Sequence, residues 1–159
     1  MINRDLVFLL SLFFAIPSPH MPVLSRADAW ARVAAARVAR LATVEADGRP
    51  HVVPCCFVLD DVTAYSAVDD KPKRRQQLRR LANVRARPVA TLLIDEYHED
   101  WAGLWWIRIG GPARVIESGP SHDRAVQLLL RKYPQYLHHR LDGPVLAVEL
   151  ASWQTWKAR

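Results

Sequence analysis

The hydrophobic residues of the first patterned segment recur at helical spacing. Ser25, with Asp28 three residues later, is typical of a helix start, because the hydroxyl caps free backbone N–H groups and an acid close to them is favourable. The Ala-rich stretch that follows places four residues on one side of a helix: Trp30, Val33, Ala34 and Val38. We therefore expect one amphipathic helix before the first strand.

After residue 39 the hydrophobic period becomes that of β-strands. β-rich runs predict six strands, with turn residues such as Asp47-Gly48 and Asp60-Asp61 between them. The predicted strands cover residues 40–45, 50–59, 63–68, 89–97, 104–116 and 144–156. The fifth contains Gly110-Gly111-Pro112, which indicates a bulge or a kink. Two more helical patterns, within 71–87 and over 120–132, complete the order of elements.

Short antiparallel strands flanked by helices predict an α+β, mainly β fold. Few parallel crossovers are expected, so a closed or partly closed antiparallel barrel fits this order of elements. The chain has 159 residues, of which 50% are hydrophobic and 24% charged, an ordinary globular composition. We expect one domain over residues 21–159.

Residues 1–20 differ in character from this domain. Leu6–Ile16 form an apolar run of eleven residues, which is too short to span a bilayer as a helix. Its length suits the core of a signal peptide, but Arg4 is offset by Asp5 and no small-x-small cleavage site follows. We expect a wrongly assigned start, with Met21 as the true one, or else a signal-like segment. No membrane association is predicted.

The positive charge of the chain is concentrated between Lys71 and Arg87. This window holds eight Lys or Arg and no Asp or Glu, whereas the rest of the chain has 14 basic and 16 acidic residues, a net of −2. Clustered cations repel one another until an anion neutralises them. A loop and a helix start would converge with Lys71, Lys73 and Arg74 on one anionic site. A solvated helix face is the alternative.

Nucleic acid is a poor candidate for that anion. No Phe, Tyr or Trp lies within the basic window, so the window offers no platform on which bases could stack. Seventeen residues are also too few for a long track along a phosphate backbone. We therefore predict no nucleic-acid partner.

Three tryptophans lie close together near the fifth predicted strand: Trp101, Trp105 and Trp106. The last two are neighbours, so one of them faces the core and the other faces outwards. An outward Trp beside Arg108 could hold a planar ring, and core packing is the alternative. The six histidines show no reliable metal-ligand spacing, so no metal site is predicted. Cys55 and Cys56 have no CxxC partner and suit a reducing, cytoplasmic compartment.

The order of these motifs resembles the pyridoxamine-phosphate-oxidase-like split β-barrel family. Five segments carry the resemblance: ARLATVEADGRPHVVPCCF, YSAVDDKPKRRQQLRRLANV, PVATLLIDEY, EDWAGLWWIRIGGPARV and PVLAVELASW. Within that family they look like the branch that uses the deazaflavin coenzyme F420, with FMN as the alternative cofactor. The resemblance implies a six-stranded antiparallel split barrel. It also implies a homodimer with the cofactor at the subunit interface.

The resemblance further implies which residues bind the cofactor. Lys71, Lys73 and Arg74 would hold its phosphate, with a contact from Ser66. The strand after DGRP would line the ring through His51, Val52, Val53 and Pro54. Trp105 and Arg108 would face the cofactor from the partner subunit. Since F420 has a poly-glutamate tail as well as a phosphate, the size of the basic segment favours it over FMN.

The implied activity is hydride transfer between F420 and a small unsaturated organic molecule. No residue stands out as a general acid, so we assign no catalytic residue. An FMN-dependent oxidase and a non-catalytic cofactor carrier are the competing hypotheses.

Overall fold

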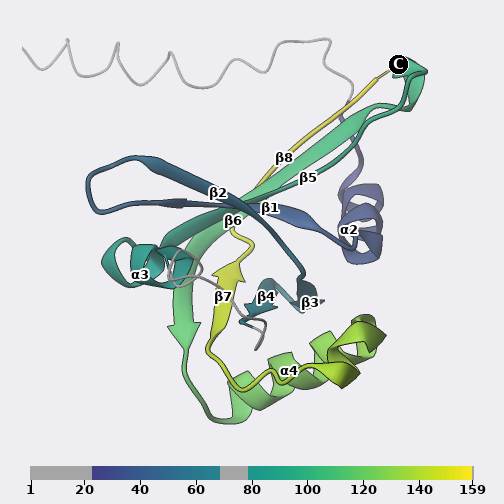
Figure 1. The fold of residues 1–159 in the computed structure, drawn as a ribbon. Coiled ribbons are helices and arrows are strands. Elements are labelled where there is room, and N and C mark those ends of the chain that lie inside the picture. The colour runs from purple at the N-terminus through teal and green to yellow at the C-terminus, as the bar shows by residue number, and fades with distance from the viewer. Residues whose placement is uncertain (1–22, 69–78, 159) are drawn as a thin grey trace, which may run out of the picture.

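The structure, a computed structural model, describes residues 23–68 and 79–158. These residues form the antiparallel split barrel that was predicted (Figure 1). Eight strands occur in the described ranges: β1 (Ala39–Val44), β2 (Pro50–Cys55), β3 (Val58–Asp60), β4 (Thr63–Ala67), β5 (Val89–Glu96), β6 (Trp105–Ile116), β7 (Val145–Glu149) and β8 (Ser152–Lys157). The helices are α2 (Arg26–Ala35), α3 (Arg79–Ala86) and α4 (Pro120–Lys132), with 3-10 turns η2 (Trp101–Gly103) and η3 (Pro134–His138). The predicted extension, residues 1–20, lies outside the described residues.

Two of the six predicted strands each occur as two shorter strands, because the chain crosses there from one part of the sheet to another. The run predicted over 50–59 pairs first with β1, as β2, and then with β4, as β3. The run predicted over 144–156 pairs as β7 with β4 and the end of β6, and as β8 with the beginning of β6. The full strand order is β2-β1-β5-β6-β7-β4-β3, with β8 on β6.

A β-bulge marks the second crossing. Between the pairs Gly110↔Ser152 and Ala113↔Val148, β6 contributes Gly111 and Pro112. The opposite run contributes one residue more, from Glu149, Leu150 and Ala151. The irregularity predicted at Gly110-Gly111-Pro112 is thus matched by an extra residue in the facing strand, which bends the sheet into the two halves of the barrel.

Gly110 allows β5 and β6 to approach each other closely. A Cβ at this position would lie 2.5 Å from the carbonyl oxygen of Ala90 and 2.9 Å from the Cα of Thr91, both backbone atoms. We expect Gly110→Ala to lower the free energy of unfolding by about 2 kcal/mol, because the strands must separate. Chemical denaturation measures this loss. Gly143→Ala is the matched control, since its Cβ would meet nothing nearer than 3.2 Å; equal losses in both variants would contradict the close approach.

The helix before the first strand begins as predicted and ends earlier. Ser25 is its N-cap and accepts a hydrogen bond from the backbone N–H of Asp28 at 3.0 Å. Val33 is fully buried, and Trp30 packs against Trp153 with ring centroids 5.8 Å apart. The helix ends at Ala35, so Val38 lies beyond it and is 43% exposed. The predicted stripe is therefore wrong at Val38 and also at Ala34, which is exposed, whereas Ala29 is buried in its place.

The hydroxyl of Tyr133 holds the chain where β2 gives way to β3. It accepts a hydrogen bond from the backbone N–H of Phe57 at 3.0 Å and lies 2.6 Å from the carbonyl oxygen of the same residue. These backbone groups have left the strand ladder and need other partners. Burial raises the pKa of Tyr133 to about 12, so the phenol remains protonated and able to donate.

Lys132, beside this crossing, is half-buried, and its amine is buried. Its Nζ lies 4.3 Å from the centre of the Phe57 ring and has no hydrogen-bond partner among the described residues. Burial lowers the pKa of Lys132 to about 8, with a smaller contribution from the charge of Arg37. The folded protein therefore releases this proton more readily than the unfolded chain does, and stability is expected to rise between pH 8 and the ordinary lysine pKa of 10.5.

We expect Lys132→Met to stabilise the protein at pH 7, because the substitution removes a charge that is costly to bury. The gain should be about 1 kcal/mol after allowance for solvent and for the cation–π contact. It should shrink as the pH rises towards 10.5, where the native amine is neutral. Denaturation curves across this range measure the gain, and a gain that does not depend on pH would contradict the explanation.

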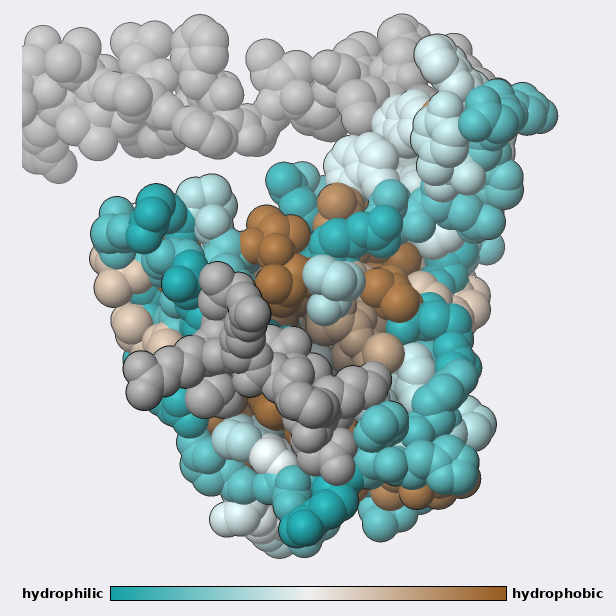
Figure 2. All heavy atoms as spheres, viewed as in Figure 1, coloured by the Kyte–Doolittle hydropathy of each residue, from teal (hydrophilic) through white to brown (hydrophobic). Residues whose placement is uncertain are grey.

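Hydrophobic residues reach the surface in the middle of one side of the molecule. Figure 2 shows them between more hydrophilic regions, near the place where β1 and β2 lie in Figure 1. Within residues 23–68 and 79–158, no helix has the length and apolar character needed to cross a bilayer.

Candidate functional site

A line of polar side chains runs through the interior between β1, β2, β4 and α3. We call it the polar seam, and it consists of Thr43, His51, Cys55, Ser66, Arg80 and Asn83. Thr43, Ser66, Arg80 and Asn83 are 3–8% exposed, and His51 is half-buried. Buried polar groups need partners, and a cluster of them in an otherwise apolar core is typical of functional sites.

Local periodicity explains why these residues meet. Along β2 alternate residues point inwards, which directs His51, Val53 and Cys55 towards the interior. In α3 the buried positions are Arg80, Leu81, Asn83 and Val84, which follow the helical repeat. The polar residues of α3 therefore lie on the same face as its hydrophobic anchors.

Arg80 is the most unusual member of the polar seam. Its Nη2 donates a hydrogen bond to the carbonyl oxygen of Ala67 at 3.3 Å, and its buried Nε has no partner among the described residues. The described chain also gives it no carboxylate. A buried cation without a counter-charge costs several kcal/mol. The hydrophobic spacing of this segment would direct its basic residues towards solvent, but Arg80 is buried, because it is four residues before the buried Val84 and shares its face.

Cys55 and Ser66 lie beside Arg80. Burial raises the pKa of the Cys55 thiol to about 11, and the hydrogen bond with Ser66 and the charge of Arg80 only partly oppose that effect. Cys55 is therefore a neutral thiol at physiological pH. Cys56, the neighbouring residue, is half-buried, and both cysteines are free.

The other end of the polar seam joins three elements through side-chain hydrogen bonds. Thr43 of β1 and His51 of β2 are directly opposite in the strand register, and the Thr43 Oγ1 lies 3.4 Å from His51 Nδ1. Asn83 of α3 donates from Nδ2 to the same Thr43 Oγ1 at 3.0 Å. Through Thr43, the imidazole of His51 is thereby connected to Asn83 on the buried face of α3.

Acids from distant parts of the chain neutralise some of the basic segment. Arg79 pairs with the half-buried Glu45 at 3.2 Å, and Arg85 pairs with Glu117 at 2.6 Å on the surface. The absence of acids within residues 71–87 of the sequence therefore overstates the local excess of charge. The predicted phosphate ligands Lys71, Lys73 and Arg74 lie outside the described residues.

The predicted ring-lining segment of β2 divides between two faces of the sheet. His51 and Val53 face inwards, whereas Val52 and Pro54 are exposed on the opposite side. Val52 is 57% exposed. His51 and Ser66 therefore both belong to the polar seam, at its two ends, whereas Val52 and Pro54 lie on the other side of the sheet. We call the exposed side of β2, β1, β5, β6 and β8 the outer face.

Trp105 and Arg108 also lie on opposite sides of β6, because they are an odd number of residues apart. The Trp105 ring is buried, its Nε1 donates to Glu96 Oε2 at 2.9 Å, and the guanidinium of Arg32 lies 4.7 Å above it. Arg108 is on the outer face, where its Nη2 donates to Gln154 Oε1. The tryptophan on the same side as Arg108 is Trp106.

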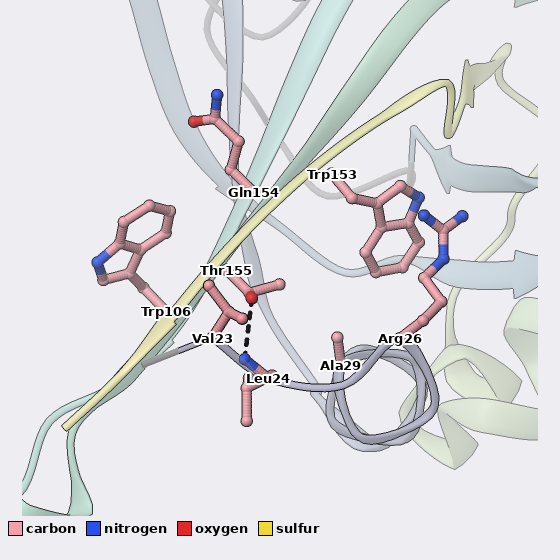
Figure 3. Close-up of a pocket in the computed structure, with 8 residues that line it drawn as sticks. All are labelled: Val23, Leu24, Arg26, Ala29, Trp106, Trp153, Gln154 and Thr155. Atoms are coloured by element: carbon pink, nitrogen blue, oxygen red, sulfur yellow. Dashed lines mark hydrogen bonds between the residues drawn. The ribbon is translucent and has the colours of Figure 1, made fainter. Parts of the chain in front are cut away.

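A cavity of about 440 Å³ opens at the edge of β8 (Figure 3). Trp153 and Trp106 border it from opposite sides of the strand, and the Leu24 N–H donates to Thr155 Oγ1 at 3.1 Å. Arg26 covers the Trp153 ring at 4.3 Å. The cavity is lined by Val23, Leu24, Arg26, Ala29, Trp106, Trp153, Gln154 and Thr155. No group of three or more potential metal ligands occurs in the described part of the chain.

The fold and this site can be compared with known proteins. The family model described as "Pyridoxamine 5'-phosphate oxidase" matches residues 27–157. The chain belongs to this family. The match spans the whole described barrel, as the resemblance of the sequence motifs predicted.

Solved structures confirm the oxidase-family fold at low sequence identity. A conserved hypothetical protein from Mycobacterium tuberculosis has a TM-score of 0.70 and 18% identity, covering 86% of this chain and 87% of that one. A FAD-binding protein from Mesorhizobium loti has a TM-score of 0.61 and 20% identity, covering 86% and 95%. A heme storage protein from Vibrio cholerae has a TM-score of 0.65 and 13% identity, covering 83% and 93%. No curated protein is similar enough to match this chain.

The polar seam suits the phosphate of an oxidase-family cofactor. Within the described residues the buried Nε–H of Arg80 has no acceptor, and Cys55 contacts the Ser66 hydroxyl and feels the charge of Arg80. Arg80 and Ser66 are both donors that a phosphoryl oxygen could satisfy. The sequence reasoning missed Arg80, Asn83, Thr43 and Cys55. Arg80 and Asn83 could have been predicted from the sequence, because the spacing of Leu81 and Val84 shows which side of α3 is buried.

Proposed function

We propose that this protein is a homodimeric oxidoreductase that uses coenzyme F420 to transfer hydride to or from a small unsaturated organic molecule. One observation carries the proposal: Arg80 is buried without a carboxylate partner in the described chain, at the start of α3 and next to Ser66. A buried cation of this kind is stable when an anionic ligand supplies the counter-charge. Membership of the oxidase family makes a phosphorylated redox cofactor the natural ligand.

The residues of this chain would bind and orient the cofactor. When bound, F420 supplies the hydride chemistry itself. Arg80 and Ser66 would hold the phosphate from the interior, and Lys71, Lys73 and Arg74 would hold it from the basic segment. His51 and Val53 would contact the ring from the inner side of β2. We assign no general acid.

The number of basic residues at the site favours F420 over FMN. Arg79 and Arg85 are already paired with acids, yet Arg80 and the basic residues between 71 and 75 exceed what one phosphate needs. A poly-glutamate tail would use these additional charges. FMN is the second candidate, because a FAD-binding protein shares the fold. A non-catalytic binding role is the third, because a heme storage protein also shares it.

The outer face supports the proposed dimer. It exposes hydrophobic side chains on a sheet, where a monomer gains from burying them: Val52 is 57% exposed and Leu93 37%. A second copy on this face would bring the partner's Arg108 to the subunit interface, where the family resemblance implies that it lies. The two free thiols suit a reducing compartment, and we propose the cytoplasm.

A side-by-side titration of the cofactor-free protein with F420 and FMN tests the cofactor. We expect tighter binding of F420, and we expect Lys73→Glu to abolish binding with little change in the unfolding curve. Arg114→Glu is the matched control, since it makes the same change of charge at an exposed position of β6 and should leave the affinity unchanged. Equal loss in both variants would show that only net charge matters.

Other outcomes identify the competing functions. A yellow protein with a flavin spectrum that prefers FMN would replace F420 with FMN. Coenzyme binding without turnover of any enone or imine would indicate a carrier. Duplex binding that falls steeply with salt would indicate a nucleic-acid function instead.

A further inference from the structure

The hydrogen bonds around Thr43 determine which ring nitrogen of His51 carries the proton. Asn83 Nδ2 can only donate, so the Thr43 Oγ1 at 3.0 Å accepts. The hydroxyl proton of Thr43 then remains available. Thr43 is 3% exposed, and the structure gives its hydroxyl one acceptor in the described chain, the Nδ1 of His51 at 3.4 Å.

The opposite arrangement is less favourable. If His51 donated from Nδ1, the Thr43 oxygen would accept two hydrogen bonds and its own proton would be buried without an acceptor. An unsatisfied buried donor costs about 1–3 kcal/mol, more than the net value of a typical hydrogen bond. The energy difference therefore favours a hydroxyl that donates to Nδ1.

We propose that Asn83 and Thr43 are positioning residues that hold neutral His51 as its Nε2–H tautomer. His51 is half-buried, and its Nε2 has no partner among the described residues. Nε2–H is thus a directed donor for a carbonyl or anionic oxygen of a ligand. That the ligand is the redox cofactor rests on the proposed function, whereas the tautomer rests on the hydrogen bonds alone.

The arrangement assigns a role to α3 beyond packing. Asn83 is 5% exposed and reaches β1 from the helix that begins with Arg79 and Arg80. One helix would then supply both the buried cation for the phosphate, through Arg80, and the support that orients His51. Arg80 lies near Cys55, and Asn83 is connected to His51 through Thr43. Cys55 and His51 both face the inner side of β2.

Nitrogen-15 NMR of the cofactor-free, full-length protein tests the tautomer directly. Histidine labelling at a pH of about 8.5, where free histidine is neutral, distinguishes a bare Nδ1 from a protonated one. His51→Gln identifies the His51 signals among those of the six histidines. We expect a bare Nδ1 in the native protein, a mixture of tautomers in Thr43→Val, and the native pattern restored in Thr43→Ser.

The wild-type spectrum can overturn the proposal without any variant: a protonated Nδ1 contradicts it. An unchanged tautomer in a folded Thr43→Val protein would also overturn it. Thr43→Val should weaken cofactor binding about two- to tenfold, the value of one neutral hydrogen bond, and Thr43→Ser should restore it. If the native protein bound neither F420 nor FMN yet showed the expected tautomers, the proposed function would fail and the positioning would stand.

Discussion

Replacing Arg80 by methionine is expected to remove cofactor binding while leaving the fold intact or stabilising it. Arg80 is 8% exposed, and within the described chain its Nε has no partner and no carboxylate pairs with it. Exchange of such a charge for an apolar side chain of similar size is often neutral or stabilising by about 1–4 kcal/mol. Loss of one partner of a buried charge pair in the complex weakens binding by about 2–5 kcal/mol, which is at least about 30-fold.

The opposite signs of these two effects make the experiment decisive. Chemical denaturation gives the stability of the cofactor-free protein, and titration gives the affinity for F420 and for FMN. Arg79→Met is the matched control in the same helix, because Arg79 is exposed and its surface pair with Glu45 is worth at most about 1 kcal/mol. If Arg80→Met binds normally, or unfolds far more easily than the native protein, Arg80 is a structural residue and not a ligand for an anion.

Val52→Asp is expected to convert a dimer into a monomer. Val52 is 57% exposed on β2 and is opposite Ala42 in the register, and the cation on the same side of β1, Arg40, is already paired with Asp95. In a two-fold interface the substitution occurs twice, and each buried, unpaired carboxylate costs several kcal/mol. The dissociation constant should rise at least about a thousandfold, which corresponds to about 4 kcal/mol.

Sedimentation of the native and variant proteins measures the change in assembly. Leu137→Asp is the control, since Leu137 is 71% exposed in η3, away from the outer face. It introduces the same charge at another exposed hydrophobic residue and should remain dimeric. A native protein that sediments as a monomer, or a Val52→Asp protein that remains a dimer, would remove the outer face from the proposal.

The sequence predicted the order of the elements well, because the hydrophobic period depends only on near neighbours. The helix start at Ser25, the antiparallel strands and the irregularity at Gly110-Gly111-Pro112 are all confirmed. It predicted six strands where eight occur, since hydrophobic pattern continues through Cys56-Phe57 and through Leu150-Ala151. Both places are crossings, and only the partner strands show that the pairing changes there.

The site was harder to predict from the sequence than the fold. Alternation along β2 already meant that His51 and Val52 face opposite ways, and the same reasoning separates Trp105 from Arg108. The helical spacing of Leu81 and Val84, visible in the sequence, already places Arg80 on the buried side of α3. The roles of Lys71, Lys73 and Arg74 remain predictions.

The sequence by itself determined the antiparallel barrel and the place of the basic segment, because local periodicity and composition need no knowledge of distant contacts. Only the tertiary structure decided which of those charges are neutralised. Glu45 and Glu117 pair with Arg79 and Arg85 from positions 34 and 32 residues away along the chain, while Arg80 is buried and pairs with no acid in the described chain. Charges neutralise one another through space and not along the sequence. An excess of Lys and Arg in the sequence therefore identifies a candidate region, and the acids that the fold brings close show which residue in it is left without a counter-charge.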